Sequence, residues 1–130
     1  MLDFRRVATL QGQAALAWGI LLLALPSPVL RVLALQTDEG GLLLARMAGG
    51  MLFALGATLF VARDALPPDA KTRVALGNAT CDLAMLIVFS TAAYTGTVGP
   101  VGYMVSLMFG INAAAWVATR IGAPSSEPPS

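Results

Sequence analysis

Four long runs of apolar residues, separated by short segments that hold most of the charges, constrain the fold of this chain more than any other feature. The runs cover residues 7–25, 42–62, 74–94 and 101–118. At about 1.5 Å of rise per residue, each run is long enough as a helix to cross the ~30 Å of hydrocarbon in a bilayer. Helices are favoured there because no water is present to hydrogen-bond the backbone. The sequence therefore predicts an all-α, integral membrane four-helix bundle.

The composition agrees with hydrocarbon as the solvent of this chain. Of its 130 residues, 57% are hydrophobic and 12% are charged, and the mean hydropathy is +0.76. A soluble domain has roughly 25% charged residues and cannot bury so large an apolar fraction. The net charge is +1 and no basic run is present, so the sequence indicates no nucleic-acid partner.

We expect one membrane domain, residues 1–122, and a disordered tail, residues 123–130, that is rich in Pro and Ser. Pro26 ends the first helix, because proline lacks an amide donor. The apolar segment after it, residues 29–36, is too short to cross a bilayer and contains Arg31. The sequence predicts a short interfacial helix here, between the first and second spans.

Basic residues fall unequally on the two sides of the predicted bundle. Lys and Arg near span ends are enriched in cytoplasmic segments, so we expect both termini in the cytoplasm. Trp116 lies near the cytoplasmic boundary, where amphipathic rings are favoured, and is expected to sit at that interface. The cytoplasmic side receives Arg5, Arg6, Arg63, Lys71, Arg73 and Arg120, and the outer side receives Arg31 and Arg46.

Asp82 lies inside the third span, ~12 Å from its first residue by helical rise. A charge near the centre of a span costs about 2.5–3.5 kcal/mol on insertion scales, so we expect Asp82 to face other helices. Asn78 lies one turn earlier on the same face, and Asn112 lies at a similar depth in the fourth span. Gln11 and the apolar ring of Trp18 come from the first span. These five residues predict a polar pocket inside the bundle.

Two interpretations of this pocket are open. In the first, the polar side chains hydrogen-bond between helices as packing contacts, at about 1 kcal/mol or less each. In the second, Asp82 belongs to a ligand or ion site, since ionisable residues within membranes are functional by default. Small residues indicate that the helices approach one another closely. They are Gly12, Ala15 and Gly19 in the first span, Gly49, Gly50, Gly56 and Ala57 in the second, and Gly110 and Ala114 in the fourth.

Arg46 lies about four residues inside the outer end of the second span, from where its side chain can reach the membrane surface. An ion pair with Asp38 or Glu39, or contact with an anionic lipid head group, is also open. Arg31 is expected at the same interface. Cys81 is expected to be a small buried apolar residue. The chain contains no histidine and no cofactor motif, so the sequence predicts no enzyme, no cofactor and no metal site.

Two segments carry a resemblance to a known family: LPSPVLRVLALQ from Leu25, and ARMAGGMLFALG from Ala45. In the second segment an arginine near the outer end of the span precedes a Gly-Gly pair and a further glycine. In these features the chain resembles small DoxX-like bacterial membrane proteins. The resemblance implies a four-helix bundle of the bacterial inner membrane, with members that act as accessory subunits of membrane oxidoreductases. It implies no catalytic residue in this chain.

Two functions of different class follow from the sequence. The first is a non-enzymatic accessory or assembly subunit, whose partners are the lipid bilayer and other membrane-protein subunits or further copies of the chain. The second is a binder or transporter that holds a small hydrophobic or cationic ligand near Asp82. We prefer the first, because small residues suited to helix contact are abundant.

Overall fold

The computed structural model describes residues 3–121, and within that range it is all-α. The helices are α1 (Phe4–Ala24), α2 (Pro26–Val32), α3 (Glu39–Ala65), α4 (Pro68–Tyr94) and α5 (Val101–Ile121). Of these, α1, α3, α4 and α5 are long and apolar enough to cross a membrane. The predicted all-α, four-helix membrane bundle is confirmed. The tail expected at 123–130 lies outside the described residues.

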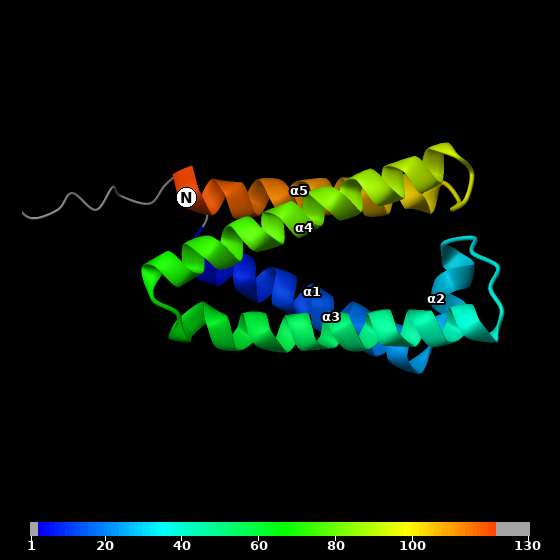
Figure 1. Ribbon diagram of the computed structural model, residues 1–130, viewed down its shortest axis with the longest axis horizontal. Coiled ribbons are helices and arrows are strands. Elements are labelled where there is room, and N and C mark those ends of the chain that lie inside the picture. The colour runs from blue at the N-terminus through cyan, green and yellow to red at the C-terminus, as the bar shows by residue number, and fades with distance from the viewer. Residues whose placement is uncertain (1–2, 122–130) are drawn as a thin grey trace, which may run out of the picture.

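The short helix between the first two spans begins earlier than predicted. It covers Pro26–Val32, whereas the sequence suggested residues 29–36. Both of its prolines lie in the first turn, where the backbone amides have no partner within the helix in any case. Figure 1 shows α2 turned away from the axes of the long helices.

The ends of α3 and α4 have local causes. The Asp38 side chain accepts a hydrogen bond from the amide of Gly41 at 2.8 Å, and this cap starts α3. The α4 helix starts at Pro68, with proline in its first turn and Asp69 close to the positive end of the helix dipole. It therefore projects six residues beyond the apolar run that begins at Val74.

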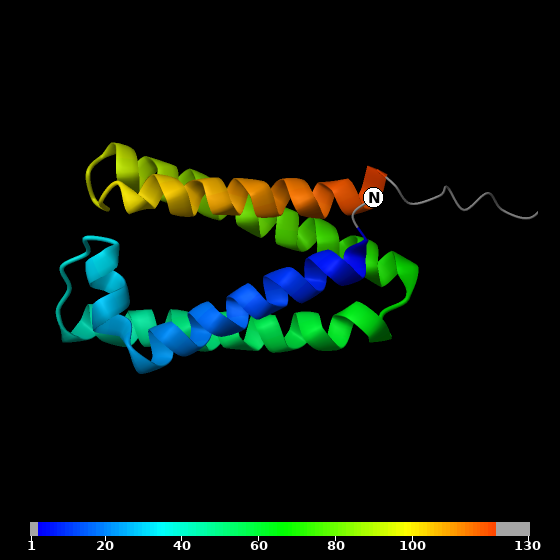
Figure 2. The same cartoon turned by 180° about the vertical axis from the view of Figure 1, so that it is seen from behind.

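The long helices form two antiparallel pairs, α1 with α3 and α4 with α5 (Figures 1 and 2). We call the end of the molecule where α1 and α4 begin and α3 ends the proximal end. The two pairs lie together there and diverge toward the other end, as both views show. At that other end the amide of Gly99, in the α4–α5 loop, donates to the carbonyl of Leu33 at 3.0 Å.

The α1–α3 pair is held by close backbone approach. A Cβ atom added at Gly19 would lie 2.7 Å from the amide nitrogen of Phe53, and one added at Gly56 would lie 2.8 Å from the carbonyl oxygen of Gly12. The spaces that these glycines leave are thus filled by the facing backbone. This is the packing that small residues permit between membrane helices, where no hydrophobic driving force brings the helices together.

A buried apolar cluster joins both pairs near the proximal end. Trp116 of α5 and Leu59 of α3 are its largest fully buried members. The complete cluster is Val7, Ala8, Leu59, Ala75, Ala79 and Trp116. All four long helices contribute to it, so this cluster fixes the position of the adjacent polar residues.

Candidate functional site

Asp82 is buried, with 4% of its surface exposed. Ala75, Ala79 and Asp82 are buried at helical spacing along α4, so this face of the helix points inward. The predicted inward orientation of Asp82 agrees with the structure. The prediction for Cys81 was wrong: its side chain is exposed, because one residue of helix rotates it about 100° away from Asp82.

The Asp82 carboxylate is held by an amide from α1. The Nε2 atom of Gln11 donates to Oδ2 of Asp82 at 3.1 Å and lies 3.3 Å from Oδ1. The Oε1 atom of Gln11 in turn accepts a hydrogen bond from the indole Nε1 of Trp116. The side-chain amide of Gln11 thus donates to Asp82 on α4 and accepts from Trp116 on α5. We call Gln11, Asp82 and Trp116 the Asp82 network.

The sequence missed Trp116 as part of this site. It was expected at the membrane interface, yet its side chain is fully buried, with its ring centroid 5.6 Å from that of Phe4. A buried indole N–H needs an acceptor, and the side-chain oxygen of Gln11 provides one. The available signal was its position one turn beyond Asn112, on the helix face that was already assigned to the interior.

The other polar candidates do not join the network. Asn78 is half-buried, and its side-chain amide donates to the carbonyl of Val74 at 2.9 Å, within α4 itself. Asn112 is half-buried and lines an open pocket of about 230 Å³ on α5, with apolar neighbours such as Met108. Asp82 does not line that pocket. Of the polar residues predicted to meet at Asp82, the structure thus brings only Gln11 to its carboxylate.

Trp18, Arg31 and Arg46 lie away from the network. Trp18 is 37% exposed and lies about two turns beyond Gln11 along α1. Arg31 and Arg46 are exposed, and neither forms an ion pair with another described residue. The suggested pairing of Arg46 with Asp38 or Glu39 is not formed among the described residues, and the Asp38 carboxylate caps α3. For Arg46, the two other predictions stand: that its side chain reaches the membrane surface, and that it contacts an anionic lipid head group.

The two tryptophans offer a direct test of the geometry, since the chain contains only Trp18 and Trp116. In vesicles with brominated acyl chains, we expect the wild-type fluorescence to be quenched mainly through Trp18, because Trp116 is fully buried. A Trp18→Phe variant should therefore lose most of this quenching. Strong quenching that persists in Trp18→Phe would place Trp116 against lipid, and the Asp82 network would not exist as described.

The network suits a structural tie better than reaction chemistry. Its carboxylate accepts from a neutral amide, and the ion pairs found among the described residues all involve Asp64, not Asp82. Residues 3–121 contain no cluster of three or more His, Cys, Asp or Glu side chains that could hold a metal ion. What the geometry supplies is a hydrogen-bonded connection between α1, α4 and α5. No protein-family model, curated protein or solved structure matches this chain.

Proposed function

We propose that the chain is a non-enzymatic accessory or assembly subunit of a larger complex in the bacterial inner membrane. The observation that carries the proposal is an exposed row of small residues on α4, formed by Gly77, Cys81 and Ala84. These residues recur at helical spacing, so they share one face of the helix. We call them the α4 outer row.

The packing of α1 on α3 shows how such a row is used within this protein. There the glycines face backbone atoms of the neighbouring helix, at distances that leave no space for a side chain. Beside Gly77, by contrast, an added Cβ atom would meet nothing within 4 Å. The α4 outer row therefore has the composition of a helix contact, but none of the described helices packs against Gly77. A transmembrane helix of another subunit fits this space.

The alternative function, a ligand site at Asp82, has less support. The carboxylate is already hydrogen-bonded by Gln11, and neither the pocket on α5 nor the pocket at the start of α1 includes it. The resemblance to DoxX-like proteins favours the accessory role. The concentration of basic residues at the proximal end favours a cytoplasmic location for that end, and so for both termini.

The single cysteine provides the experiment. We expect a photoreactive maleimide attached to Cys81 in native membranes to give one discrete heavier species after illumination, containing a different membrane protein. Gly77→Leu should reduce its yield about tenfold or more, because overpacking of a close contact costs typically 1–3 kcal/mol and 1.4 kcal/mol corresponds to tenfold. Gly50→Leu is the matched control, since Gly50 also borders open space but lies on α3.

Three results would count against the accessory role. Adducts with lipid alone would show that the α4 outer row faces the bilayer. A species with the mass of two copies of this chain would identify a homo-oligomer contact instead. Equal yields from Gly77→Leu and the wild type would show that the crosslinked protein does not pack on this row.

A further inference from the structure

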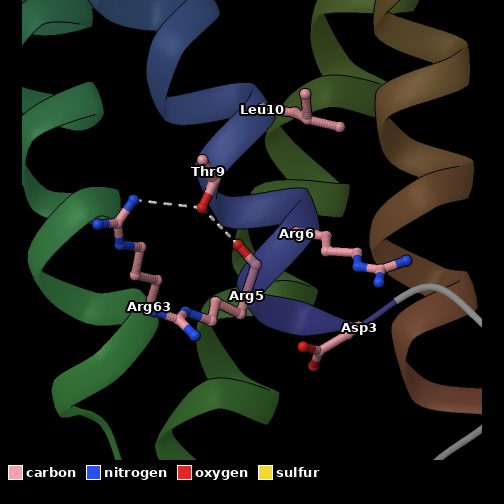
Figure 3. A pocket seen from close by; sticks show the side chains of 6 residues that line it. All are labelled: Asp3, Arg5, Arg6, Thr9, Leu10 and Arg63. Atoms are coloured by element: carbon pink, nitrogen blue, oxygen red, sulfur yellow. Dashed lines mark hydrogen bonds between the residues drawn. The ribbon is translucent and has the colours of Figure 1, made fainter.

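A second cluster of polar groups lies at the proximal end, where α1 begins and α3 ends. Its side chains border an open pocket of about 700 Å³ (Figure 3). The lining residues are Asp3, Arg5, Arg6, Thr9, Leu10 and Arg63. In the view of Figure 3, the guanidinium groups of Arg5 and Arg63 lie on one side of α1 and that of Arg6 lies on the other. The apolar runs start at Val7 and end at Ala62 here, so the pocket lies at the boundary between hydrocarbon and water.

Two of the three arginines form ion pairs with the same carboxylate, that of Asp64. Asp64, which does not line the pocket, forms an ion pair with Nε of Arg5 at 2.8 Å and accepts a hydrogen bond from Nε of Arg63 at 3.0 Å. The Arg63 guanidinium also lies 4.6 Å from the centre of the Phe60 ring. Because Asp64 engages only the Nε atoms, terminal nitrogens of both arginines remain to bind a further anion.

Thr9 positions Arg63 from the α1 side. Its hydroxyl donates to the backbone carbonyl of Arg5 at 2.7 Å and accepts from a terminal nitrogen of Arg63 at 3.4 Å. Arg6 has no ion pair or side-chain hydrogen bond with another described residue. Of the pocket lining, only Asp3 carries a negative charge, against the three arginines. With Asp64 counted as well, the cluster holds three positive and two negative charges, a net +1 that favours an anion.

The apolar edge of the pocket indicates which kind of anion. Leu10 is 66% exposed. It shares one face of α1 with three further exposed residues at helical spacing, Ala14, Ala17 and Leu21. This strip of α1 runs from Arg6 into the hydrocarbon, and within residues 3–121 no other helix covers it. A phosphate with acyl chains attached would use both the arginines and the strip. Free phosphate would use the arginines alone.

From this combination we propose that the pocket binds the phosphate of an anionic phospholipid, with its acyl chain along the exposed strip of α1. Arg6, which lies on the same side of α1 as Leu10, contacts the phosphate. Arg5 and Arg63 add positive charge from the other side of α1. A guanidinium group matches phosphate oxygens in geometry as well as in charge. Basic pockets between membrane helices bind lipid head groups in the same way.

The test uses the purified full chain in a neutral detergent. Phosphatidylglycerol, phosphatidylcholine or inorganic phosphate is added separately, and binding is measured by native mass spectrometry and by the shift in melting temperature. We expect phosphatidylglycerol to be retained and to raise the melting temperature, and the other two to have little effect. Arg6→Gln should weaken phosphatidylglycerol binding about tenfold, because a charge-assisted contact is lost. Asp3→Asn should strengthen it about threefold, because a repulsive charge is removed.

Arg73→Gln is the matched control, since Arg73 is exposed on α4 at the same end and does not line the pocket. It should bind as the wild type does, and melting temperatures without lipid should show that all three variants fold. An equal loss of binding in Arg73→Gln would show a general effect of positive charge and overturn the site. Stabilisation by inorganic phosphate as large as that by phosphatidylglycerol, or equal retention of phosphatidylcholine, would overturn the assignment to an anionic lipid.

Discussion

A Gly49→Leu variant should lose the packing of α1 on α3, whereas Gly50→Leu should keep it. A Cβ atom at position 49 would lie 2.9 Å from the carbonyl oxygen of Gly19, from Cβ of Leu22 and from the amide nitrogen of Leu23. Two of these are backbone atoms, so the helices must separate to accept any side chain. Overpacking costs typically 1–3 kcal/mol, and leucine at a backbone contact should lie at or above the upper end.

Gly50, the next residue along α3, is the matched control for Gly49. At Gly50 an added Cβ atom would meet nothing within 4 Å, although the residue lies on the same helix. Both substitutions remove the helix penalty of glycine, about 1 kcal/mol, so this contribution cancels between the two variants. The measurement is the melting temperature of the purified protein in detergent, together with its elution profile. Equal stability of the two variants would mean that α1 and α3 do not approach as closely as described.

The fold follows from the sequence in some respects and departs from it in others. Hydropathy identified all four membrane-crossing helices, because insertion into lipid requires long apolar runs. It did not identify the start of α4 at Pro68, since a helix continues into water for as long as its capping and backbone hydrogen bonds allow. The sequence analysis also did not predict that the long helices associate as two diverging pairs. In lipid the apolar faces of all four helices are equivalent, and only specific close contacts select neighbours.

The candidate site was predicted only in part, because the sequence does not show which helices become neighbours. The insertion cost of Asp82 placed it inside the bundle, and Gln11 was predicted to reach the same pocket from the first span. Which face a helix turns inward depends on its packed neighbours, and this decided the positions of Cys81 and Trp116. Asn78 was on the predicted face but satisfied its amide through the backbone of its own helix. Such local competition for hydrogen bonds has no clear signal in the spacing of residues.

The second large effect is expected at Gln11. Gln11→Leu removes the donor to Asp82 and the acceptor for Trp116 in one step, and leaves two buried polar groups without these partners. Each such loss costs about 1–3 kcal/mol, so we expect a total destabilisation of roughly 2–6 kcal/mol and a clear fall in melting temperature. Gln13→Leu is the control, because Gln13 is exposed on the same helix and should change stability by less than about 0.5 kcal/mol.

A double-mutant cycle separates the structural tie from a ligand site. If Gln11 stabilises the bundle by holding Asp82, then Asp82→Leu removes the stranded carboxylate, and the Gln11→Leu, Asp82→Leu protein should be more stable than the sum of the single effects implies. The coupling expected for such a contact is about 1 kcal/mol, within the range for hydrogen bonds between membrane helices. Additive effects of the two substitutions would show that Gln11 and Asp82 do not act together. Asp82 would then have no structural reason to remain buried, and its cost in the membrane would again favour a ligand or ion.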